Sequence, residues 1–139
     1  NEPQPDALLR IEPQVGGNSS ISDDDYIEGS PELIVEVAAS SASYDLNDKL
    51  KAYRRNGVRE YIVWQIYENR VDWFLLQEGR YVPLMPDERS IIRSQVFPGL
   101  WLSVNGLLQR NRAEILAVLQ EGLQTVEHQS FVERLSQDA

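Results

Sequence analysis

The sequence predicts an α/β (α+β) fold, in which a mixed β-sheet is flanked by helices and followed by C-terminal helices. Three observations predict it: an apolar strand-like run at 33–39, a helical pattern at 44–56 and a second apolar strand at 60–67. Strands, a helix, more strands and terminal helices in this order are typical of a sheet with helices packed on it.

The N-terminal part contributes two predicted strands and one helix. Residues 6–11 predict a short strand after Pro5, and residues 12–31 predict a polar loop because glycine, serine and aspartate dominate them. Residues 33–39 are apolar on both faces, as expected of a central strand. The helix at 44–56 follows Ser43, a favourable N-cap residue, and should end at Asn56-Gly57.

The remaining chain predicts further strands and then helices. Residues 60–67 and 70–76 predict a hairpin, short strands follow at 81–84 and 91–96, and 97–102 closes the sheet region. Apolar residues at helical spacing predict amphipathic C-terminal helices, with Ile115, Leu116, Leu119 and Leu123 in one group and Phe131, Val132 and Leu135 in the next. We therefore expect one domain, with a core at 1–108 and a helical extension at 109–139.

Composition limits the function. The 139 residues include 13 Lys+Arg and 22 Asp+Glu, and the net charge of −9 argues against a protein that coats nucleic acid, although it permits a local basic site. The absence of cysteine excludes disulfides and thiolate zinc sites, and fits a reducing, cytoplasmic location. No apolar run approaches the ~20 residues that span a bilayer, so no membrane partner is expected. Because the chain begins with Asn1 rather than methionine, we expect that the N-terminal part of the core is missing.

Glu36 is the anomalous residue of the apolar strand. Three apolar residues flank it on each side, so its carboxylate should be buried or lie at the floor of a cleft. A buried carboxylate needs a cation or a hydrogen-bond donor. One alternative is a structural salt bridge with an arginine, and another is a partly exposed strand face.

Lys49 is the natural partner for Glu36. On the predicted helix, Leu46, Leu50 and Tyr53 form the stripe that faces the sheet, and Lys49 lies on the same stripe or its edge. The alternative is an ordinary helix pair with Asp45, four residues earlier.

Asp6 supplies a second carboxylate. If its strand pairs beside the strand at 33–39, Asp6 and Glu36 converge into a hard-oxygen site that suits Mg²⁺. A nearby lysine ammonium can then stabilise charge that develops on a phosphate, which is the chemistry of phosphodiester hydrolysis.

A series of short motifs runs through the chain in a defined order. They are Gln4-Pro5-Asp6, Pro31-Glu32-Leu33-Ile34-Val35-Glu36-Val37, Ser40-Ser41, Asp45, Lys49, Tyr53, Gly57-Val58-Arg59-Glu60-Tyr61 and Phe97-Pro98-Gly99-Leu100. Over roughly residues 4–108, the series resembles the Uma-two family, a group of restriction endonuclease-like proteins of cyanobacterial type. That family is similar to PD-(D/E)XK nucleases, whose core is a mixed sheet flanked by helices.

The resemblance implies a site and a reaction. Asp6 and Glu36 match the acids that hold Mg²⁺ or another divalent cation, and with Lys49 they match the catalytic residues. The usual lysine two residues after the glutamate would fall at Ala38, and Lys49 of the following helix matches its replacement. A small residue at Ala38 leaves room for Lys49, because positions 36 and 38 face the same way.

The resemblance also implies a substrate and supporting residues. The expected activity is Mg²⁺-dependent cleavage of DNA, with Asp45 holding Lys49 in place and Tyr53 near the site. A homodimer is expected because two sites are needed to cut both strands. The first alternative is a non-catalytic nucleic-acid or protein-binding domain that keeps the nuclease fold. The second is a structural domain in which Glu36 and Lys49 form a buried ion pair.

Overall fold

The computed structural model describes residues 5–39 and 43–137, without the side chains of residues 43–46. The chain forms two compact units, Asn1–Pro83 and Leu84–Ala139. The predicted division into 1–108 and 109–139 stays a prediction.

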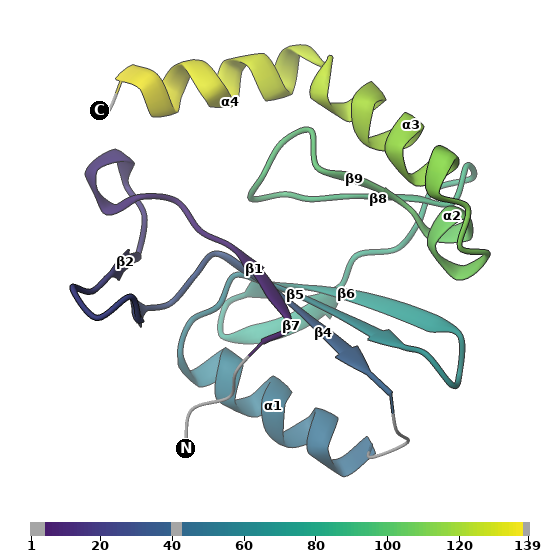
Figure 1. Ribbon diagram of the computed structural model, residues 1–139, viewed down its shortest axis with the longest axis horizontal. Coiled ribbons are helices and arrows are strands. Elements are labelled where there is room, and N and C mark those ends of the chain that lie inside the picture. The colour runs from purple at the N-terminus through teal and green to yellow at the C-terminus, as the bar shows by residue number, and fades with distance from the viewer. Residues whose placement is uncertain (1–4, 40–42, 138–139) are drawn as a thin grey trace. The chain divides into compact units, whose positions relative to one another are not determined.

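The first unit is built on a five-stranded mixed sheet (Figure 1). Its strands are β1 (Ala7–Leu9), β4 (Leu33–Ala38), β5 (Glu60–Gln65), β6 (Arg70–Gln77) and β7 (Arg80–Pro83), and they lie side by side in this order. Only β4 and β5 pair in parallel, since helix α1 (Ser43–Arg55) returns the chain between them; the other pairs are antiparallel.

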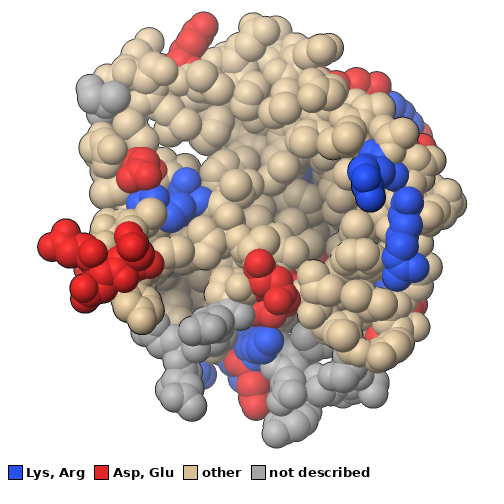
Figure 2. Space-filling model, viewed as in Figure 1, with Lys and Arg blue, Asp and Glu red and all other residues tan. Residues whose placement is uncertain are grey.

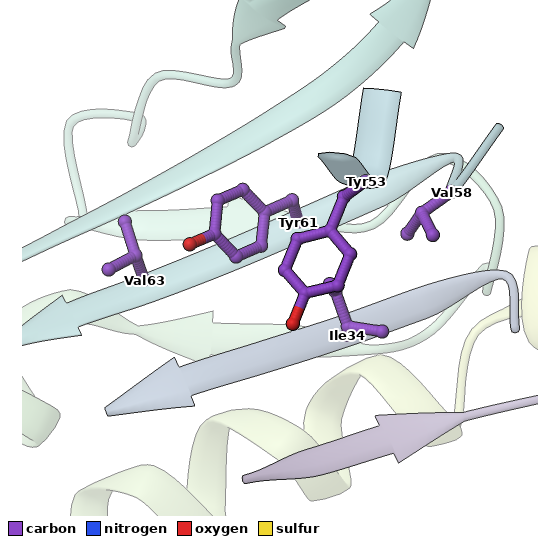
Figure 3. Close-up of a cluster of buried hydrophobic side chains, with 5 residues drawn as sticks. All are labelled: Ile34, Tyr53, Val58, Tyr61 and Val63. Carbon is purple, nitrogen blue, oxygen red and sulfur yellow. The ribbon is translucent and has the colours of Figure 1, made fainter. Parts of the chain in front are cut away.

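One face of this sheet packs against α1. A buried cluster joins the strands to the helix, and it consists of Ile34, Tyr53, Val58, Tyr61 and Val63 (Figure 3). Leu8, Ala38 and Leu50 pack against the cluster. Side chains alternate between the two faces of a strand, so Ile34, Glu36 and Ala38 share one face of β4. Ile34 and Ala38 pack in the cluster with Tyr53 of α1, so this shared face is the one toward the helix. The predicted common direction of residues 36 and 38 therefore agrees with the packing.

Helix α1 ends where its sequence predicts. Gly57 adopts a left-handed backbone with φ of 77°, and the Val58 N–H donates to the Tyr53 carbonyl oxygen at 3.0 Å. A glycine accepts this conformation without steric cost, which is why the helix stops at Asn56-Gly57.

The segment predicted as a loop is more ordered than expected. It contains a short 3₁₀ turn, η1 (Pro13–Val15), and an antiparallel hairpin of β2 (Ser19–Ile21) and β3 (Ile27–Gly29). These strands have three residues each, too few for alternation to predict them.

The second unit has its own small sheet. Among the described residues, strands β8 (Ile91–Arg93) and β9 (Trp101–Ser103) pair with each other and with no strand of the five-stranded sheet. Strand β9 overlaps the segment 97–102, which the sequence predicts as the end of the sheet region, and helices follow it. Three helices follow, α2 (Val104–Leu108), α3 (Arg112–Leu123) and α4 (Val126–Gln137), and α3 packs against β9. The predicted C-terminal helices are confirmed.

The fold class is confirmed as mixed α+β, with one mixed five-stranded sheet, smaller sheets and flanking helices. Within residues 5–39 and 43–137, every helix is too short or too polar to cross a membrane.

Candidate functional site

Glu36 is buried in the middle of β4, with 3% of its surface exposed. Both carboxylate oxygens have partners from α1. The Lys49 ammonium lies 3.1 Å from Oε2, and the Tyr53 hydroxyl donates to Oε1 at 2.5 Å. The expected cation and an additional hydroxyl donor thus satisfy this buried acid together.

Lys49 and Tyr53 reach Glu36 because α1 runs back over β4 and β5. Tyr53 is buried, whereas the Lys49 side chain is 39% exposed, so the ammonium lies between the core and solvent. This matches the expectation that Lys49 lies at the edge of the inward stripe. The side chain of Asp45, its other expected partner, lies outside the described residues.

Asp6 lies at the end of β1, next to Glu36. The pairing of Ala7 with Val35 places residue 6 opposite residue 36 if the register continues. The Asp6 N–H donates to the Val35 carbonyl oxygen at 3.0 Å, and its Oδ2 accepts from the Val37 N–H at 2.6 Å. Asp6 is exposed, so this site has one carboxylate open to solvent, bound to the Val37 N–H, and one buried carboxylate at Glu36.

Glu36 and Asp6 both raise the pKa of the Tyr53 hydroxyl. Burial raises the pKa of Tyr53 most, and its hydrogen bond to Glu36 and the Glu36 charge raise it further; the Asp6 charge adds a smaller contribution in the same direction. Tyr53 therefore stays protonated and donates to Glu36 at any ordinary pH.

The donor set fits a hard cation with few protein ligands. Among residues 5–39 and 43–137, no group of three or more His, Cys, Asp or Glu side chains could hold a metal ion. Mg²⁺ usually takes one or two carboxylates together with waters and substrate phosphates. Asp6 and Glu36 can supply that number. One oxygen of Asp6 already accepts a hydrogen bond, and both oxygens of Glu36 already have partners.

Two further glutamates are buried without having been expected. Glu32 accepts from the N–H groups of Ile11 at 2.7 Å and Asn18 at 3.0 Å, which ties the segment before β2 to β4. Glu60 accepts from the Trp73 indole at 3.2 Å. Their partners are remote in sequence, so no local pattern indicates their burial.

Acidic side chains also gather away from this site. Figure 2 shows a group of them over the β2–β3 hairpin, where Asp23, Asp24, Asp25 and Glu28 are all exposed. Consecutive exposed acids repel an anionic partner, so this surface is unsuited to contact with nucleic acid.

The comparisons with known proteins agree with the fold and the order of the motifs. No curated protein matches the chain. The sequence profile of a family named Uma2, with the description "Putative restriction endonuclease", matches residues 1–105, about three quarters of the chain. The five-stranded mixed sheet with α1 packed on it, together with the smaller sheets and the other helices, is consistent with a restriction-endonuclease-like fold. The chain therefore belongs to the Uma2 family.

Proposed function

We propose that this chain is a Mg²⁺-dependent DNA endonuclease domain of the PD-(D/E)XK type. The description of its family supports a nuclease-like function with DNA as the substrate. The observation that carries the proposal is the buried Glu36 carboxylate, which pairs with Lys49 at 3.1 Å, while the Asp6 carboxylate accepts from the N–H of the next residue on the strand, Val37.

In the proposed site, each side chain has one task. Asp6 and Glu36 hold the cation; when bound, Mg²⁺ supplies positive charge that polarises the phosphate. Lys49 stabilises negative charge on the phosphate oxygens or orients the attacking water. Tyr53 fixes the Glu36 carboxylate through its hydrogen bond, and Asp45 holds Lys49 in place.

Basic side chains on α1 and in the segment between α1 and β5 support an anionic substrate. Lys51, Arg54, Arg55 and Arg59 are exposed, and the ion pairs found in the described part of the chain use none of them. Unpaired surface cations are available to phosphates, and their binding should weaken as salt rises.

The proposal includes a homodimer, because one site cuts one strand and a duplex has two. It also includes a cytoplasmic location, which suits a chain without cysteine. The cyanobacterial type stays a prediction.

Plasmid cleavage tests the reaction. We expect the wild-type chain to nick or linearise supercoiled DNA with Mg²⁺ and not with EDTA, and we expect Glu36→Gln and Lys49→Met to lose this activity. Glu60→Gln is the matched control, because it makes the same change at another buried glutamate, on the neighbouring strand. Equal cleavage by wild type and Glu36→Gln contradicts the assignment.

A second candidate is a non-catalytic binding domain with the same fold. The net charge of −9 favours the form of this candidate that binds protein, since a nuclease and a DNA-binding domain both usually present more positive charge. Any salt-dependent DNA binding by such a domain would survive Glu36→Gln, and no Mg²⁺-dependent cleavage would be observed. A metal-binding site instead predicts that Mg²⁺ raises the Tm of the wild type and not that of Glu36→Gln.

A further inference from the structure

Tyr61 on β5 carries a buried hydroxyl that the roles above do not use. The residue is 1% exposed, and its hydroxyl oxygen has no hydrogen-bond partner among residues 5–39 and 43–137. Burying a hydroxyl without a partner is costly, so such groups call for an explanation.

Packing alone does not explain the hydroxyl. The Tyr61 ring packs against Tyr53 at 5.2 Å and against Phe74 at 6.2 Å between centroids. Phe74 shows that this cluster accepts a ring without a hydroxyl. A phenylalanine at position 61 would fill the same space and would leave no polar atom to satisfy.

The hydroxyl points toward the level of Glu36. In the parallel register, Tyr61 lies opposite Ile34, and the next residue on the same face, Val63, lies opposite Glu36. Figure 3 shows the Tyr61 hydroxyl directed along β5 toward Val63, while Tyr53 extends from α1 with its hydroxyl over β4. Burial raises the pKa of Tyr61 most, and the Glu36 charge raises it next, which agrees with this proximity.

The occupant that could reach this hydroxyl must be small. A residue that is 1% exposed cannot meet a phosphate group or another side chain from outside. A water molecule can occupy a buried position when two or more polar groups bind it. Ala38, the next residue after Glu36 on this face of β4, fills little of the nearby space.

We propose that the Tyr61 hydroxyl donates to a buried water molecule that also binds the Glu36 carboxylate, which makes Tyr61 a positioning residue of this site. Glu36 then has three supports: Lys49, Tyr53 and the water fixed by Tyr61. The consequence for cleavage rests on the proposed function, whereas the water site itself rests only on the geometry.

A double-mutant cycle tests the link between Tyr61 and Glu36. We expect Tyr61→Phe to raise the equilibrium constant of unfolding about three- to tenfold in the wild-type background. In a Glu36→Met background, where the water has lost its acceptor, we expect no such increase. Urea denaturation of the four proteins measures the coupling.

Tyr81→Phe is the matched control for this cycle. Tyr81 belongs to the same aromatic group, but its hydroxyl donates to the Val58 carbonyl oxygen at 2.7 Å. Tyr81→Phe should therefore lower the free energy of unfolding by the same amount in the wild-type and Glu36→Met backgrounds. The proposal is overturned if Tyr61→Phe is as stable as the wild type, or if its cost is the same with and without Glu36.

Two further measurements do not depend on the stability of the Glu36→Met variant. A crystal structure should contain an ordered water within about 3.2 Å of both the Tyr61 hydroxyl and a Glu36 oxygen; a well-ordered site without it overturns the proposal. In cleavage assays, Tyr61→Phe should lower kcat about tenfold at unchanged KM. If the effects of Tyr61→Phe and Glu36→Met on stability are coupled but the wild-type protein cleaves no DNA, the water site is supported and the proposed nuclease activity is rejected.

Discussion

The Glu36 carboxylate shows how one residue can organise a site. An acid that is 3% exposed on an apolar strand is unstable alone, so its neighbours must supply charge and donors. Lys49 and Tyr53 do so from a single helix, at 3.1 Å and 2.5 Å. The same arrangement that makes the acid tolerable in the core also fixes the orientation of its carboxylate.

Lys49→Met should destabilise the protein, because Glu36 keeps its buried charge and loses its cation. We expect a loss of about 1–2 kcal/mol in the free energy of unfolding, below the cost for a fully buried pair, since the Lys49 side chain is 39% exposed. Chemical denaturation measures it. Lys51→Met, an exposed lysine on the same helix, should change stability little, and equal losses in the two variants would contradict the role of the Glu36 pair.

At the scale of elements, contacts between residues far apart in sequence fix the conformation of segments that have no clear local sequence pattern. Glu32 accepts backbone N–H groups from Ile11 and Asn18, and this joins the irregular segment before β2 to the start of β4. Gly17 lies so close to the chain at Ile11 that a side chain there has no space: an added Cβ would meet the Ile11 carbonyl oxygen at 1.6 Å.

Gly17→Ala should therefore disrupt this segment. We expect a loss of about 3 kcal/mol, because backbone atoms cannot give way as a flexible side chain can. Gly79→Ala is the control: it has a φ of 76° but no atom within 4 Å of the added Cβ, so only about 1 kcal/mol of backbone strain is expected. Thermal or urea denaturation compares them, and equal losses would show that Gly17 is not constrained by close packing.

The turn before β8 should make stability depend on pH. The Ile91 N–H first, and then the Arg93 guanidinium at 2.6 Å, hold the pKa of Asp87 below its ordinary value of 3.8. A lowered pKa in the folded state stabilises the fold above the unfolded pKa, and this contribution disappears as the pH falls through the folded value.

Asp87→Asn should thus be less stable than the wild type at pH 7, and the difference should shrink below about pH 4. Denaturation curves at several pH values measure this difference. Glu133→Gln, at an exposed position of α4, serves as the control. A difference that stays constant down to pH 2 would contradict the ionised role of Asp87.

At the scale of the whole molecule, the proposed function needs two copies of the site. Large apolar side chains are exposed on the two long C-terminal helices, namely Leu116, Leu123, Val126 and Val132. Exposed apolar residues in one region are typical of an interaction surface. Leu116, Leu123 and Val132 belong to the apolar groups that the sequence predicts for these helices.

We expect sedimentation equilibrium to give a mass of twice 15.9 kDa, and Leu116→Glu with Val132→Glu to give a monomer. Met85→Glu places the same charge at another exposed apolar residue of the second unit and should leave the dimer intact. A monomeric wild-type chain at high concentration would contradict the dimer.

The sequence alone determined the order of the main elements and the candidate acid. Apolar runs and helical spacing depend on neighbours along the chain, so they revealed β4, α1 and β5, and they marked Glu36 as misplaced among apolar residues. The end of the helix at Asn56-Gly57 could also be predicted, because it too depends on neighbouring residues in the chain.

Only the tertiary structure decided which groups meet. Strand register and helix placement bring the Tyr53 hydroxyl to Glu36 and the Asp6 carboxylate to the Val37 N–H. They also leave the Tyr61 hydroxyl without a partner in the part of the chain that the structure describes. The same holds for the separate β8–β9 sheet and the buried Glu32. The hydrogen bonds of Glu32, Glu36 and Asp6 join residues from 13 to 31 positions apart in sequence, and long-range pairing leaves no local periodicity from which it could be predicted.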